Sequence, residues 1–169
     1  MDIRVSASGE LQWANRTYRC AVGRGGVRID KQEGDGATPV GRFPLRRVLY
    51  RPDRLSAPGT RLPVTPLTPA DGWCDDPADP HYNRPVRLPY AAHHEELWRA
   101  DPLYDIVVIV GHNDAPVIAG LGSAIFMHSA SEDYRPTEGC VALARQDLLD
   151  VLAGVGPDTV LAIGAAAGR

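Results

Sequence analysis

Lysine is nearly absent from this 169-residue sequence, because Lys31 is the only lysine among 18 basic residues. The formal net charge is -3 at pH 7, which excludes the broad positive surface expected of a nucleic-acid-binding protein. Long apolar runs are also missing, since no stretch of about 18 residues is apolar enough to span a bilayer. We therefore expect neither a nucleic-acid partner nor a membrane span.

Cysteine is scarce as well, with only Cys20, Cys74 and Cys140 in the chain. So small and odd a number excludes a disulfide framework, and the absence of a CxxC spacing excludes the usual zinc sites. A disulfide between Cys20 and Cys74 would require an oxidising compartment. We therefore expect at least one free thiol, no metal and no cofactor.

The amino-terminal stretch MDIRVSASGELQW lacks the apolar segment and the small-residue cleavage site of a secretion signal. This favours a cytoplasmic protein, and a periplasmic one if a signal has been removed. Neither a low-complexity linker nor an internal duplication is present, so residues 1–169 are expected to form a single domain.

Glycine and proline are abundant, with 17 and 15 residues, and they divide the chain into short alternating or β-branched segments. This pattern is typical of a mainly β protein. The expected strands are 3–6, 10–14, 16–22, 41–50, 106–111, 123–127 and 159–163, with shorter ones at 61–64 and 86–88. One or two short helices are expected, in RQDLLDVLAGVGP (145–157) and AAHHEELWRADP (91–102). Nine prolines between residues 51 and 90 predict a loop that caps a cleft.

The stretch IFMHSASEDYRPTEGCVAL (125–143) places one histidine and one cysteine beside two apolar runs. A cysteine reacts as its thiolate, so it needs a nearby base and backbone N–H groups that stabilise the oxyanion. His128 can supply the base if the loop folds back, and Gly139 gives the backbone freedom to aim N–H groups into a cleft. By spacing alone, a buried cysteine and a satisfied histidine at unrelated strand ends are the more frequent outcome.

Other polar residues have simpler explanations. His112 is a second candidate base, although a polar residue at a strand end is the more frequent outcome. The adjacent histidines at 93 and 94 cannot share one helical face and are expected at the surface. Asp75, Asp76, Asp79 and His81 of WCDDPADPHYNRP resemble a metal site but fit no calcium-loop spacing, so these aspartates are expected to accept backbone N–H groups in turns.

Three ordered motifs resemble the catalytic domain of the L,D-transpeptidases, the YkuD family, in its proteobacterial branch. MHSA followed by PTEGCVAL is similar to the active-site signature of that family, a His, a loop, Ser or Thr, one residue, Gly and Cys. GDGATPVGRF (34–43) resembles its Thr-Pro-x-Gly-x-Phe segment, and YDIVVIVGHN with GLGSAIFMH resembles a strand pair of the branch. The resemblance covers residues 20–163 and implies a β-rich sandwich or mixed sheet.

The resemblance also implies a role for each matching residue. Cys140 matches the nucleophile, and His128 matches the base, which the backbone carbonyl of Ser129 would orient. The backbone N–H of Gly139, with that of Cys140, would stabilise the oxyanion. The residues expected to bind substrate are Tyr82, Asn83, Arg84, Arg135, Thr137 and Glu138, and Arg145 is a further candidate for a substrate carboxylate.

Two positions depart from the family pattern. Many members have His where this chain has Glu138, and Arg or Asn where it has Ala142. An acidic side chain beside the thiol would raise the pKa of Cys140 unless it points away, so the sequence leaves Glu138 unexplained.

The expected reaction is attack of Cys140 on the L,D peptide bond of a peptidoglycan tetrapeptide stem, with release of terminal D-alanine and formation of a thioester. Water as acceptor would make the protein an L,D-carboxypeptidase of peptidoglycan recycling, which a cytoplasmic location favours. An amine acceptor would make it a transpeptidase that forms cross-links or exchanges D-amino acids. The remaining alternatives are another cysteine hydrolase and a non-catalytic wall-binding module, and the expected acylation of Cys140 by a carbapenem would argue against both.

Overall fold

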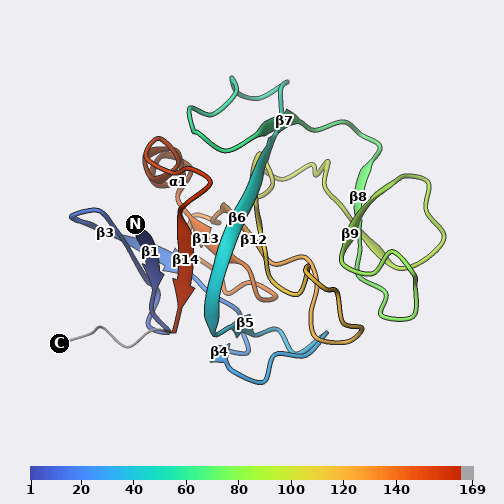
Figure 1. Ribbon diagram of the computed structural model, residues 1–169. Helices are drawn as coiled ribbons and strands as arrows, with labels where there is room; N and C mark the ends of the chain where they lie inside the picture. Colours follow the sequence, from blue (N-terminus) through green and yellow to red (C-terminus); the bar gives the residue numbers. More distant parts are fainter. Residues whose placement is uncertain (165–169) are drawn as a thin grey trace.

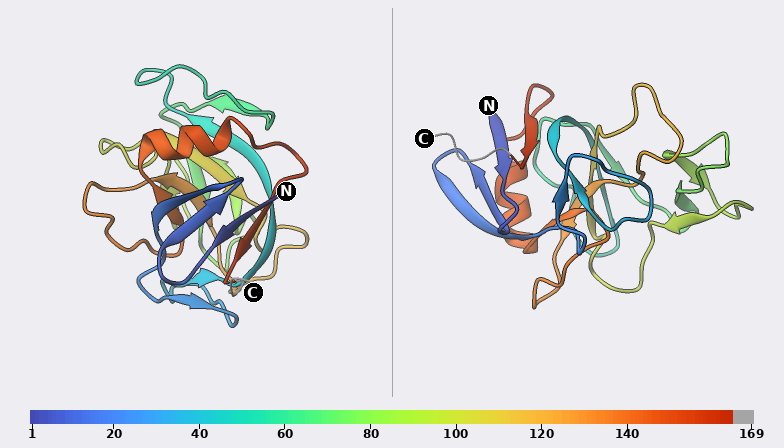
Figure 2. Two further views of the ribbon diagram at one scale, coloured as in Figure 1. Left: turned by 90° about the vertical axis from the view of Figure 1, so that its left-hand side faces the viewer. Right: turned by 90° about the horizontal axis from the view of Figure 1, so that it is seen from below.

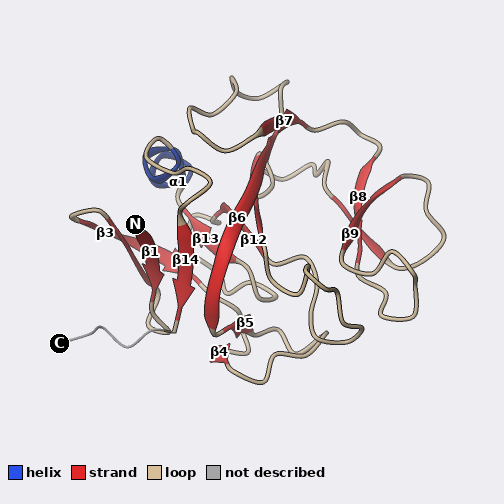
Figure 3. Ribbon diagram, viewed as in Figure 1, coloured by secondary structure: helices blue, strands red, loops and turns tan. Residues whose placement is uncertain are grey.

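The computed structural model describes residues 1–164 and is built almost entirely from β-strands (Figure 1, Figure 3). Within these residues lie fourteen strands and one helix, α1 (Arg145–Leu152). The strands are β1 (Asp2–Val5), β2 (Glu10–Trp13), β3 (Arg16–Ala21), β4 (Val27–Arg28), β5 (Thr38–Pro39), β6 (Gly41–Tyr50), β7 (Val64–Pro66), β8 (Asp71–Cys74), β9 (Arg84–Arg87), β10 (His94–Glu96), β11 (Ile106–Val110), β12 (Phe126–Ser129), β13 (Val141–Leu143) and β14 (Val160–Ile163). The prediction of a mainly β protein is therefore confirmed.

Eight of the described strands form one sheet that closes on itself as a ring. Their hydrogen-bonded order is β11-β12-β13-β3-β2-β1-β14-β6, and β11 also pairs with β6, which closes the ring. The long strand β6 makes closure possible, because residues 41–44 pair with β14 whereas residues 45–50 pair with β11. The mixed sheet is thus a single sheet closed on itself rather than two separate layers, and Figure 2 shows it from two further sides.

The side chains of β11 point alternately into two different hydrophobic cores. Each of its five residues is buried, as expected for an uninterrupted apolar strand. Ile106, Val108 and Val110 pack in the core enclosed by the ring, whereas Val107 and Ile109 face a second core outside it. Helix α1 buries its apolar face in the first core. Nothing helical within residues 1–164 has the length and apolar character that crossing a bilayer requires.

A second sheet, β10-β8-β9, stands outside the ring and belongs to the proline-rich part of the chain (Figure 1). Buried Asp105, directly before β11, joins two other parts of the chain. It pairs with Arg54 of the loop that follows β6, at 2.7 Å, and with Arg145 at the start of α1. The Arg51 guanidinium lies 3.7 Å from the ring centre of Trp98. The long segment is therefore packed onto the ring by specific polar and cation–π contacts.

The prediction of a helix at 91–102 is wrong. Residues His94–Glu96 form β10, which pairs antiparallel with β8, so ladder hydrogen bonds outweigh the weak helix preference of a short segment. The strand expected at 123–127 is found at Phe126–Ser129, because Ala124 has φ of 53° and cannot continue an extended strand. His128 consequently lies inside a strand and not after one, whereas β6 has the expected bounds.

Candidate active site

His128 and Cys140 are brought together by two neighbouring parallel strands. In the ladder of β12 and β13, Met127 pairs with Val141 and both pack in the core of the ring. Side chains alternate along a strand, so His128 and Cys140 project on the opposite side, outside the ring. Both line the same cavity, which has a volume of about 650 Å³. The loop between them folds back as the sequence predicts.

The His128 ring is fixed in one orientation. Its Nδ1 lies 2.9 Å from the carbonyl oxygen of Ser129, the partner expected from the sequence. Because a carbonyl can only accept, Nδ1 carries the proton in the neutral ring and Nε2 keeps its lone pair. The Tyr104 ring packs against it edge-on, with 5.1 Å between ring centres. Burial lowers the pKa of His128 to about 4, so the free imidazole is neutral at pH 7.

The Cys140 thiol is enclosed between a backbone group at the start of β12 and one of the turn that precedes it. Its Sγ–H donates to the Ala124 carbonyl at 3.3 Å, and Sγ accepts the Phe126 N–H at 3.4 Å. Burial, with a further contribution from the Glu95 carboxylate, raises the pKa of Cys140 to about 12. Thiol and imidazole are therefore both neutral in the free protein, and attack by the sulfur would require transfer of its proton to a base such as Nε2 of His128.

The turn before the thiol requires glycine. Gly139 has φ of 135°, and a Cβ there would lie 2.7 Å from the Ala37 carbonyl oxygen. Its N–H donates to Thr137 Oγ1 at 3.1 Å, while the Thr137 hydroxyl donates to the Cys140 carbonyl at 2.6 Å. The Gly139 N–H is thus used within the turn, contrary to its expected role. The Cys140 N–H has no acceptor within residues 1–164 and is the better oxyanion donor.

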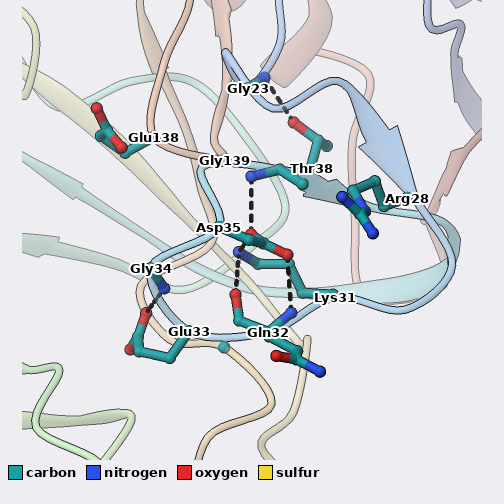
Figure 4. Close-up of polar contacts among 12 residues, drawn as sticks. Gly23, Arg28, Lys31, Gln32, Glu33, Gly34, Asp35, Thr38, Glu138 and Gly139 are labelled. Atoms are coloured by element: carbon teal, nitrogen blue, oxygen red, sulfur yellow. Dashed lines mark hydrogen bonds and ion pairs between the residues drawn. The ribbon is translucent and has the colours of Figure 1, made fainter.

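The loop at residues 31–37 packs against this turn through the Ala37 carbonyl (Figure 4). The single lysine, Lys31, is only 8% exposed and donates to Asp35 at 2.5 Å and to the Gln32 carbonyl at 3.0 Å. The Asp35 carboxylate also accepts the N–H groups of Gln32 and Ala37. One buried ion pair therefore sets the shape of the loop, whose residues 33 and 34 line the cavity.

Glu138 is paired with Arg24, whose side chain also lies against Gly36 of the loop at 31–37. The Arg24 N–H groups reach both carboxylate oxygens at 2.9 Å, so the acid that the sequence leaves unexplained has a cationic partner. Glu138 nevertheless lines the rim of the cavity, as do Thr137 and Arg135. These three residues lie where the sequence predicts.

The other predicted substrate contacts do not reach the cavity. Tyr82 is buried, and its hydroxyl accepts the Gly122 N–H at 3.0 Å. Asn83 is also buried, with Oδ1 accepting from the Trp73 indole and the Ala124 N–H. Both side chains are committed to holding the strand turn that precedes β12, so the expectation that they contact substrate does not fit the structure.

Two arginines that were expected to bind substrate carboxylates also lie outside the cavity of Cys140. Arg84 lines a separate hollow and donates to the Asp114 carbonyl at 3.2 Å. Arg145 pairs with buried Asp105, which makes it part of the packing between ring and loops. Neither Arg84 nor Arg145 lines the cavity of Cys140.

The remaining polar residues follow the simpler explanations. Asp76 and Asp79 accept the N–H groups of Ala78 and His81, as turn residues do, whereas Asp75 pairs with His93 at 2.5 Å. His112 is half-buried outside the cavity of Cys140, and burial lowers its pKa to about 4. Cys20 and Cys74 are free and buried.

The sequence reasoning missed several cavity residues, and four polar ones, Glu95, Arg99, Asp101 and Tyr104, come from one short segment. Glu95 accepts the Tyr104 hydroxyl at 2.7 Å, and Arg99 pairs with Asp101 at 2.5 Å. All four belong to the segment for which a helix was expected, or follow it directly. A strand interpretation of His94–Glu96 would have put Glu95 and Glu96 on opposite faces and pointed to one inward carboxylate.

Comparison with known proteins gives one match. The sequence model described as YkuD, the L,D-transpeptidase catalytic domain, matches residues 6–163. No curated protein and no solved structure matches the chain significantly.

Proposed function

Since this chain belongs to the L,D-transpeptidase catalytic domain family, which performs cysteine-dependent catalysis on peptidoglycan, we propose that Cys140 is its nucleophile. The supporting observation is that Cys140 and His128 face one cavity from adjacent parallel strands, with the Nδ1 of His128 turned to Ser129. The substrate is a peptidoglycan tetrapeptide stem, cleaved at its terminal L,D peptide bond.

The first half of the reaction forms a thioester. The Cys140 sulfur bonds to the carbonyl carbon while its proton passes to Nε2 of His128. The Cys140 N–H stabilises the resulting oxyanion. The carbon–nitrogen bond then breaks, and the leaving D-alanine amine takes the proton from His128. Neither thiol nor imidazole needs a metal for these steps, so we expect activity to survive EDTA.

For the second half, we favour water as the acceptor. Carboxylates outnumber guanidinium groups in the cavity lining, with Glu33, Asp75, Glu95, Asp101 and Glu138 against Arg99 and Arg135. Negative potential holds an entering amine in its ammonium form, which has no lone pair for attack, whereas water remains uncharged. The protein is then an L,D-carboxypeptidase, and a cytoplasmic role in turnover of released stem peptides is our proposal for its location. Cell-wall transpeptidation, with an amine acceptor, is the alternative.

The decisive experiment is mass spectrometry of a tetrapeptide stem incubated with the protein, with and without excess D-amino acid. Loss of D-alanine alone supports the carboxypeptidase, whereas an exchange or cross-linked product supports the transpeptidase. Cys140→Ala must abolish either product, and Cys74→Ala, which removes a buried thiol remote from the ladder of β12 and β13, must not. A carbapenem adduct is expected on Cys140, and an adduct on another cysteine would contradict the assignment.

A further inference from the structure

We propose that Glu95 is a second catalytic base, which activates the acceptor water that hydrolyses the Cys140 thioester. This inference rests on the proposed function and adds a residue to its second half. It divides the proton transfers between two groups, with His128 serving acylation and Glu95 serving hydrolysis.

The fold presents Glu95 to the cavity and its neighbour to solvent. Glu95 pairs with Trp73 in the ladder between β10 and β8, and it lines the cavity with Cys140 and His128. Glu96, the next residue of the strand, is exposed and does not line that cavity. The chain thus carries two adjacent glutamates, of which only Glu95 lines the cavity of Cys140.

One oxygen of Glu95 is held and the other is left for a ligand. The Tyr104 hydroxyl donates to Oε1 at 2.7 Å, and the same tyrosine ring packs edge-on against His128. Within residues 1–164, Oε2 accepts no hydrogen bond, so it is available to a water molecule in the cavity. Tyr104 is buried and therefore fixes the carboxylate relative to the imidazole.

The surroundings strengthen Glu95 as a base. Burial raises its pKa, Asp75 and Glu33 raise it further, and Arg99 and the Tyr104 hydroxyl act in the opposite direction. The pKa of His128, by contrast, is lowered to about 4 by burial. A base is stronger when its conjugate acid has a higher pKa, so in this cavity the carboxylate is better suited than the imidazole to take a proton from water.

The proposed step balances as follows. The water oxygen bonds to the thioester carbon while one water proton passes to Oε2 of Glu95. The carbon–sulfur bond then breaks, sulfur leaves as thiolate, and the proton on Glu95 is relayed to sulfur through water or His128. The products are the shortened peptide acid and the free Cys140 thiol, and no oxidant, reductant or metal takes part.

The same carboxylate disfavours the first half of the reaction. The negative charge of Glu95 contributes to the raised pKa of Cys140. Removing the charge should therefore make the thiol more reactive while making the thioester longer-lived. A purely structural role would impair both steps together, so the opposite signs are a signature of the proposed one.

The test is Glu95→Gln, with Glu96→Gln as the matched control. Alkylation of Cys140 by iodoacetamide near pH 8, followed by mass spectrometry, should be several-fold faster in Glu95→Gln than in the wild type. Hydrolysis of the acyl-enzyme formed from a tetrapeptide stem should be slower by about 100-fold or more, so that the thioester accumulates as an intact-mass adduct. Glu96→Gln should match the wild type in both measurements.

A second variant distinguishes the proposed role of Glu95 from a general loss of folding. Tyr104→Phe keeps the ring but removes the hydroxyl that holds Glu95, so thioester hydrolysis should fall by an intermediate factor while acylation persists. Unchanged thioester hydrolysis in Glu95→Gln, or a parallel loss of alkylation and hydrolysis, would overturn the proposal. Wild-type protein that forms no acyl-enzyme and releases no D-alanine would instead refute the proposed function itself.

Discussion

Arg24 and Glu138 form a forked ion pair beside the nucleophile, with the Arg24 Nε 2.9 Å from both carboxylate oxygens of Glu138. The pair raises the pKa of Arg24 and gives the acid a cationic partner. It explains how an acidic residue can directly precede the Gly139–Cys140 turn. Both side chains are more than half exposed, so the pairing is open to screening by salt.

Arg24→Gln should leave the Glu138 charge uncompensated and slow alkylation of Cys140 at low ionic strength. The expected effect is about threefold, and it should vanish at about 0.5 M salt because surface charges are then screened within a few ångströms. Alkylation rates at the two salt concentrations test this. The double variant Arg24→Gln with Glu138→Gln should regain the wild-type rate, and a slow double variant would contradict the electrostatic explanation.

Protein stability should fall as the pH drops below the ordinary histidine range. Burial lowers the pKa of both His128 and His112 to about 4, whereas the unfolded chain titrates near 6.5. Below pH 6.5 the unfolded state binds protons that the folded state excludes, so this stabilisation is complete above 6.5 and is lost progressively down to about pH 4. Urea unfolding near pH 7.5 and pH 5 measures the loss.

The control for this prediction is His112→Gln, which should lose less free energy of unfolding between the two pH values than the wild type. The comparison also cancels His93, whose pKa is raised by Asp75 and which acts in the opposite direction. An equal loss in variant and wild type would show that His112 does not contribute.

Gly139→Ala should inactivate the protein without unfolding it. The added Cβ would lie 2.7 Å from the Ala37 carbonyl at a φ of 135°, so the turn must move and displace Cys140. A displacement of about 1 Å at a nucleophile can cost about 100-fold in rate. Release of D-alanine and circular dichroism measure the two effects, with Gly59→Ala as control because its Cβ position is open. Full activity in Gly139→Ala would contradict the tight packing of the turn.

Asp105→Ala should destabilise the protein by about 3–5 kcal/mol, because it leaves Arg54 and Arg145 without their buried anion. Urea unfolding measures the cost. Asp30→Ala removes an aspartate from the exposed pair with Arg28 and should leave the free energy of unfolding nearly unchanged, because water and salt screen such a pair. Similar losses in the two variants would mean that Asp105 does not anchor the loops.

The parts of the fold set by local pattern could be predicted. Strand β6 spans ten residues with the expected bounds, and the apolar run of β11 is buried throughout as expected. Closure of the ring could not be predicted, because it depends on β6 bending between two distant partners, β14 and β11. Such pairings join segments far apart in the chain and leave no short-range signal.

The site was predictable to the extent that it follows chain order. His128, Ser129 and Cys140 lie together because adjacent parallel strands carry them, and the spacing of the motif reflects that connection. Asn83 was misplaced because its φ of 55° turns the backbone and directs the side chain inward, which its sequence neighbours do not reveal. Glu95 was missed because three residues of β10 become a strand only through pairing with β8.

The separation of the small sheet β8–β10 from the ring divides the enzyme into two modules. The ring carries the thiol and the imidazole, while the appended sheet carries Glu95 and shares no ladder hydrogen bond with the ring. Under the proposed role of Glu95, the carboxylate that resolves the covalent intermediate and the two side chains that form it are therefore carried by different sheets. We expect substitutions at Glu95 to change the fate of the acyl-enzyme while the pairing of the strands next to His128 and Cys140 is kept.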